Sequence, residues 1–272
     1  MFRMGQMRKR RPRRSIAMLR EDLSIGRFLP SGLTLLGLCT GATAIRFALS
    51  GHWQAAVVAI VLAAVLDTMD GSLARLLHLD SKFGAQLDSL ADLVSFGIAP
   101  SVLVYMWTLY QGDGAGWTIA LAFCACCAIR LARFNVESAE AEEDDGDAPA
   151  TFSGVPAPAA ACLILLPMLL EFQFKLPILR DPFVNGGLMA LVSLLMVSRL
   201  PTPSLKRMYV PAHLKAPVLA AVCLLATCLI LWPWATLTAA LLLYIAALPF
   251  GRRPPGKLRR SFTRPPNPPA DS

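Results

Sequence analysis

Four aspartates interrupt a part of the chain that is otherwise apolar enough to cross a membrane. They are Asp67, Asp70, Asp88 and Asp92. An ionised carboxylate in a lipid-embedded helix costs about 2.5 kcal/mol or more unless it has a partner. The chain is therefore expected to fold so that these four side chains face the interior of a helical bundle and share a function there.

The first half of this stretch places its acidic and small residues on one face of a helix. At about 100° per residue, Asp67, Asp70, Gly71 and Ala74 fall within roughly 100° of one another, with Arg75 at the edge of that sector. Side chains three and four positions apart on a helix are neighbours, so the two carboxylates of this half point the same way.

The second half gives a narrower stripe, with its members about one turn apart. They are Gly84, Asp88, Asp92, Ser95 and Ala99. Two neighbouring helices are thus predicted to direct two carboxylates each into a common space.

Four carboxylates in one space repel each other unless cations lie between them. Ligation by oxygen alone favours a hard divalent ion such as Mg²⁺ or Mn²⁺, whereas zinc prefers His and Cys. Gly71, Ala74 and Gly84 leave room for a bulky ligand to approach the backbone, and Arg75 supplies a cation suited to phosphate. These residues together predict a metal-dependent site for a substrate that contains a diphosphate.

The spacing from Asp67 to Asp92 reads D-x2-D-G-x2-A-R-x8-G-x3-D-x3-D. It resembles the signature of the CDP-alcohol phosphotransferase family, with every signature position and both spacings kept. The resemblance implies an all-α membrane bundle that transfers a phosphatidyl group from CDP-diacylglycerol to an alcohol and releases CMP. It also implies a homodimer.

The resemblance and the helical geometry assign roles to the signature residues. Asp67, Asp70 and Asp88 are expected to hold two Mg²⁺ or Mn²⁺ ions. Asp92 is the candidate general base, since an alcohol must lose a proton as it attacks, and a further candidate metal ligand. Contact with the nucleotide is assigned by family analogy to Thr34, Asp67, Gly71, Ala74, Arg75 and Gly84.

Two later segments indicate which alcohol accepts the phosphatidyl group. A-x-R-L-A-R-F-N, residues 128–135, and F-x-G-x-P-x-P-A, residues 152–159, resemble the phosphatidylserine synthase branch, which implies L-serine as the acceptor. Arg130 and Arg133 are one turn apart at the expected depth of the aspartates. We interpret them, with Asn135, as ligands of the serine carboxylate or of a lipid phosphate.

Two alternatives remain open at this point. The same chemistry could use glycerol 3-phosphate, inositol phosphate or another polar alcohol. A phosphorylated acceptor would need additional cations near the site, and Arg130 and Arg133 do not exclude it. A cation-coupled transporter is the alternative from another class. A transporter would be expected to carry its acids near the bilayer midplane in broken helices and to show a sequence repeat between its two halves. The sequence shows neither feature.

Composition agrees with an integral membrane protein, because 55% of the 272 residues are hydrophobic, 16% are charged and the mean hydropathy is +0.53. Apolar runs predict about eight transmembrane helices. They cover about 33–49, 53–78, 83–110, 117–136, 159–170, 183–197, 217–231 and 234–248. Residues 28–250 are thus expected to form the transmembrane catalytic domain.

The charges predict the orientation. Residues 1–27 carry nine Lys or Arg and are expected to lie on anionic lipid at the cytoplasmic face of the cell (inner) membrane, with an interfacial helix over 15–29, rather than on nucleic acid. The basic, Pro-rich tail 251–272 is expected to be disordered and cytoplasmic. Spans two and three meet on the same side, so the site is predicted to face the cytoplasm.

Three further features have simpler interpretations. The segment 137–149 holds seven acids and is predicted to be a polar, mobile loop. The seven cysteines lie in apolar runs, which favours packing over a thiolate metal site. Gly37 and Gly41 could form a helix-dimer motif, or they could allow close packing within the bundle.

Overall fold

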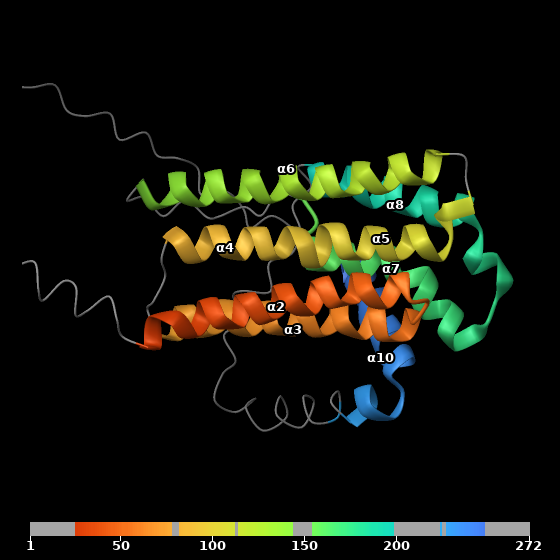
Figure 1. The fold of residues 1–272 in the computed structure, drawn as a ribbon, viewed down its shortest axis with the longest axis horizontal. Coiled ribbons are helices and arrows are strands. Elements are labelled where there is room, and N and C mark those ends of the chain that lie inside the picture. Colours follow the sequence, from red (N-terminus) through yellow and green to blue (C-terminus); the bar gives the residue numbers. More distant parts are fainter. Residues whose placement is uncertain are drawn as a thin grey trace, which may run out of the picture.

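The computed structural model describes residues 25–77, 82–111, 114–143, 154–198, 224 and 227–247. All regular structure in these ranges is helical, and the long helices lie side by side in one bundle (Figure 1). The α-helices are α2 Ile25–Leu49, α3 Trp53–Leu77, α4 Lys82–Asp92, α5 Ala99–Trp107, α6 Ala115–Glu143, α7 Ala157–Phe174, α8 Pro182–Val197 and α10 Pro233–Ala247. Short helical turns are the π-helix η1 Leu93–Ile98 and the 3-10 helices η2 Leu109–Gln111 and η3 Pro177–Arg180.

The bundle is that of an integral membrane protein, and the predicted all-α membrane fold is confirmed. Five helical stretches in the described ranges are long and apolar enough to cross a membrane, namely Ser31–Leu49, Trp53–Leu73, Phe83–Trp107, Ala115–Ser138 and Ala157–Phe174. Pro182–Val197 and Pro233–Ala246 are shorter apolar helices. Of the predicted seventh span, 217–231, residues 217–223, 225 and 226 lie outside the described residues.

The first helix begins earlier than predicted. α2 starts at Ile25, so the segment 30–34 lies inside the helix rather than before it. Residues 25–29 of the predicted interfacial helix belong to α2, and residues 15–24 lie outside the described part of the chain, as does the tail 251–272.

The predicted acidic loop is wrong over its first half. α6 continues without a break to Glu143, so Glu137–Glu143 is helical. Alanine and glutamate, which dominate this segment, have high helix propensity, and this outweighs the repulsion among its acids. Residues 144–149 lie outside the described residues.

A tight turn reverses the chain between α2 and α3. Gly51 has φ of +73°, a conformation that glycine adopts without a steric penalty. Its N–H donates to Ala48 O at 3.0 Å, and the N–H of His52 donates to Phe47 O at 2.9 Å, which caps the end of α2. This hairpin packs α3, which carries Asp67 and Asp70, along α2.

Gly41 brings α2 against the π-helix η1. A Cβ on Gly41 would come within 2.7 Å of Ser95 Cα, a separation that real Cβ atoms essentially never show. The Ser95 hydroxyl donates to Gly37 O at 3.3 Å. Of the two interpretations of Gly37 and Gly41, the structure supports close packing within the bundle.

Gly41→Ala is therefore expected to destabilise the protein by about 1–3 kcal/mol, because an overpacked core must shift its backbone. Thermal unfolding of the detergent-solubilised protein measures this. Gly32→Ala is the matched control on the same helix, because a Cβ there meets nothing within 4 Å. Equal melting temperatures for the two variants would contradict the close-packing interpretation.

Candidate metal centre and active site

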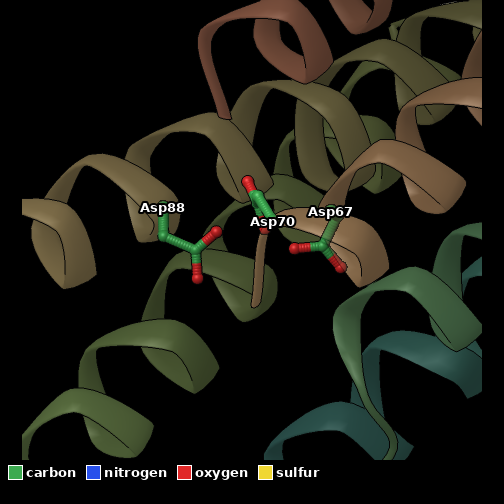
Figure 2. A group of neighbouring side chains, drawn as sticks. All are labelled: Asp67, Asp70 and Asp88. Atoms are coloured by element: carbon green, nitrogen blue, oxygen red, sulfur yellow. The ribbon is translucent and has the colours of Figure 1, made fainter. Parts of the chain in front are cut away.

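Three carboxylates from two helices meet in the bundle. Asp67 and Asp70 lie near the C-terminal end of α3, and Asp88 lies on α4. One oxygen from each carboxylate lies within 4.8 Å of the others. In Figure 2, Asp88 and Asp67 approach from opposite sides with Asp70 between them. Three carboxylates this close, inside a membrane span, could hold a divalent cation.

Asp92 joins the same cluster at the end of α4. It lines the same small cavity as the other three aspartates, and its carboxyl group lies within hydrogen-bonding distance of that of Asp67. Two carboxyl groups at such a distance need a proton or a cation between them. The structure therefore brings all four aspartates of the sequence pattern into one space.

The cavity between these carboxylates suits an ion. Its free volume is about 10 Å³, close to that of one water-sized particle. Asp70 is 4% exposed, and its Oδ2 has no hydrogen-bond partner among the described residues. The Thr34 hydroxyl, on α2, hydrogen-bonds with the Asp70 side chain. A buried carboxylate oxygen without a donor, beside two further carboxylates, fits Mg²⁺ or Mn²⁺.

A π-helical turn follows the cluster directly. The α-helical pattern ends at Asp92 and η1 occupies Leu93–Ile98. The Ser101 hydroxyl lies within 2.8 Å of Gly97 O and 2.9 Å of Ile98 O, so it satisfies carbonyl groups of the wider turn. Ser95, inside η1, lines the cavity with Asp88 and Asp92, whereas Ala99 is fully buried in the core.

Comparison with known proteins agrees with this geometry. Residues 27–198, which contain every described element from α2 to α8 except the first two residues of α2, match the family described as CDP-alcohol phosphatidyltransferase. The chain belongs to this family.

Curated relatives of this CDP-alcohol phosphatidyltransferase resemble it over most of their length. A protein of Mycobacterium leprae is 36% identical over 222 residues, which cover 82% of this chain and 73% of that protein. A protein of Mycobacterium tuberculosis is 35% identical over 229 residues, covering 83% and 78%. Both are named CDP-diacylglycerol–serine O-phosphatidyltransferase.

Among solved structures, a crystal structure of Mycobacterium tuberculosis phosphatidylinositol phosphate synthase in complex with manganese and citrate is 22% identical to this chain. The matched region covers 67% of this chain and 81% of the crystallised chain, with a TM-score of 0.44.

The other signature positions of this CDP-alcohol phosphatidyltransferase lie on the same two helices as the aspartates. Gly71 lies on α3, and a Cβ there would meet nothing within 4 Å, so the space beside it is open to a ligand. Gly84 lies one turn before Asp88 on α4. Ala74 and Arg75 continue α3, but their side chains lie outside the described residues. Nucleotide contact by these residues stays a prediction.

The three residues predicted to bind the acceptor alcohol lie on α6 and have different partners. Arg133 Nη1 donates to Val197 O at 3.1 Å, at the C-terminal end of α8. Asn135 Nδ2 lies 2.9 Å from Ser89 Oγ, which links α6 to the helix that carries Asp88. Arg130 lies within electrostatic range of Asp92. The structure brings Arg130 to the cluster, whereas Arg133 and Asn135 have partners within the protein.

Cys124 and Cys127 of this family member pack between α6 and the segment from η1 to α5. Cys127 is fully buried, and a Cβ added at Gly97 of η1 would meet its Sγ at 3.3 Å. Cys124 Sγ lies 2.9 Å from Ser101 Oγ. Within the described ranges, the one group of residues able to hold a metal is the aspartate triad, which includes no cysteine.

Proposed function

We propose that the protein transfers the phosphatidyl group of CDP-diacylglycerol to the hydroxyl of L-serine, giving phosphatidylserine and CMP. The observation that carries this is the identity of 35–36% to two serine O-phosphatidyltransferases over most of both chains. The four aspartates that meet in the bundle supply the chemistry that such a transfer needs. This activity requires L-serine and CDP-diacylglycerol as substrates and membrane lipid as the surroundings.

Asp67, Asp70 and Asp88 would hold the metal, and we assign two Mg²⁺ or Mn²⁺ ions to the site with Asp92 as a further ligand. When bound, such ions neutralise the diphosphate charge and stabilise CMP as the leaving group. Thr34 holds the Asp70 carboxylate in position. The open space at Gly71 admits the nucleotide, which Ala74, Arg75 and Gly84 would also contact.

Asp92 would act as the general base. Its carboxylate takes the proton from the serine hydroxyl while the hydroxyl oxygen attacks the phosphatidyl phosphorus. The bond from this phosphorus to the CMP oxygen breaks, and CMP leaves. The place of Asp92 beside Asp67, at the end of the cluster that Arg130 approaches, supports this role.

The location and assembly are further parts of this proposal. Residues 28–250 would form the catalytic domain in the cell (inner) membrane, with both termini and the site on the cytoplasmic side. The end of α3 and the start of α4 lie at the same end of the bundle, beside the aspartates (Figure 1). α2, which follows the basic N-terminal segment of the sequence, begins at that same end (Figure 1), and this charge favours the cytoplasm there. A homodimer follows by family analogy.

The activity is tested with purified protein, CDP-diacylglycerol and Mg²⁺ or Mn²⁺. CMP release is measured with serine, glycerol 3-phosphate, inositol phosphate or no alcohol. We expect release that depends on serine and on the metal, with phosphatidylserine as the lipid product. Faster release with glycerol 3-phosphate or inositol phosphate would overturn the serine assignment, and an absence of CMP release with every alcohol would overturn the transferase itself.

A further inference from the structure

Two polar groups outside the aspartate cluster are buried without a hydrogen-bond partner among the described residues. They are the Nε of Arg130, on α6, and the hydroxyl of Tyr244, on α10. The two side chains lie within electrostatic range of each other, although they come from distant parts of the chain. A buried donor without an acceptor costs about 1–3 kcal/mol. Two unpartnered donors within electrostatic range of each other suit a ligand that offers acceptor oxygens.

Arg130 approaches the aspartate cluster at Asp92. Asp92 itself interacts with the other three aspartates. The triad is the proposed place of the metal and the diphosphate, and Asp92 is the proposed base. The pair of Arg130 and Tyr244 is therefore on the side where the alcohol must enter.

Tyr244 also stands at a boundary between apolar and polar surroundings. Its side chain lines a cavity of about 270 Å³ between α3, α7 and α10. Every other residue that lines this cavity is apolar or a cysteine, including Val57, Val61 and Leu165. A phenol suits this position, because its ring packs against the apolar wall while its hydroxyl remains free to bind a polar ligand.

We propose that Arg130 and Tyr244 together bind the carboxylate of the acceptor serine, with the guanidinium and the phenol both donating hydrogen bonds to it. This rests on the proposed function and names the acceptor part of its site. In serine only the α and β carbons separate the carboxylate from the hydroxyl group. A carboxylate held by this pair thus places the hydroxyl toward Asp92. Hydrogen bonds to an ionised group are about twice as strong as neutral ones, which offsets the cost of burying the carboxylate.

Tyr244→Phe tests this, because it removes the hydroxyl and keeps the ring. We expect KM for serine to rise about tenfold, equivalent to about 1.4 kcal/mol, while KM for CDP-diacylglycerol changes by less than about twofold. The second acceptor is 2-amino-1,3-propanediol, which has a hydroxymethyl group in place of the carboxylate. Its reaction should be unchanged, so the preference for serine over this diol should fall about tenfold.

Two further variants complete the test. Arg130→Lys keeps the positive charge but loses the planar guanidinium group that can donate two parallel hydrogen bonds. It should lower the preference for serine over the diol, and it keeps the proposal testable even if Tyr244→Phe does not fold. Tyr105→Phe is the matched control, because Tyr105 makes an edge-to-face contact with Trp117, with ring centroids 5.1 Å apart, where α5 ends and α6 begins. It should leave both acceptors unaffected.

The outcomes separate this proposal from the one on which it rests. Wild-type CMP release that does not depend on serine would overturn the proposed function. With serine-dependent release established, a rise in KM for CDP-diacylglycerol alone would show that the pair binds a lipid phosphate. An equal loss with both acceptors would show a structural role. Either result, or an unchanged preference in both variants, would overturn the carboxylate site while leaving the proposed function intact.

Discussion

Asp92→Asn is expected to lower serine-dependent CMP release by about 10²–10⁴-fold, the usual contribution of a general base. Asparagine has nearly the same shape as aspartate and cannot accept a proton from the serine hydroxyl. The variant should therefore fold and still bind CDP-diacylglycerol. The measurements are the rate of CMP release at saturating serine and the binding of the CDP-lipid by calorimetry.

Asp181→Asn provides the same chemical change away from the site. Asp181 caps α8 by accepting a hydrogen bond from the Phe183 N–H at 2.7 Å, and asparagine caps helices equally well. This variant should keep wild-type activity. Retained turnover with serine in Asp92→Asn would remove Asp92 as the base.

Asp70→Asn is expected to reduce CMP release by at least about a thousandfold, because a metal in such a site supplies several kcal/mol of charge stabilisation. Asp70 is the most deeply buried residue of the triad, and its unpartnered Oδ2 is the atom best placed to ligate an ion. The asparagine can still accept a hydrogen bond from Thr34. Binding of Mn²⁺, followed by electron paramagnetic resonance of the free ion, should weaken in parallel.

Comparison with Asp181→Asn separates loss of the ion from a general effect of removing a negative charge. The control should bind Mn²⁺ as the wild type does. If Asp70→Asn bound Mn²⁺ with unchanged affinity, the triad would not be the metal site, whatever happened to the activity.

The helical projection located the aspartates correctly because both α3 and α4 are regular where the acids lie. Periodicity decides which side chains share a face, and apolar length decides where a membrane helix runs. The same reasoning missed the continuation of α6 to Glu143, because acidic residues were read as a loop signal although Ala and Glu favour helix.

The acceptor side of the site could not be read from the sequence in the same way. The spacing of Arg130 and Arg133 shows that both lie on one face of α6, but it cannot show that α8 ends at Val197 beside Arg133. Tyr244 had no local signal at all, because its place near Arg130 depends on how α10 packs against distant helices. Such contacts are set by tertiary structure and not by a repeating pattern.

The π-helical turn Leu93–Ile98 has a consequence for how this membrane span can vary. Each residue added to or removed from a helix rotates everything beyond it by about 100°. Removing one residue here, to restore regular winding, would turn α5 relative to the acids on α4. The π-helical turn thus separates the rotation of α5 from that of α4. The acids on α4 can keep their direction into the site while α5 presents a different face to the surrounding lipid.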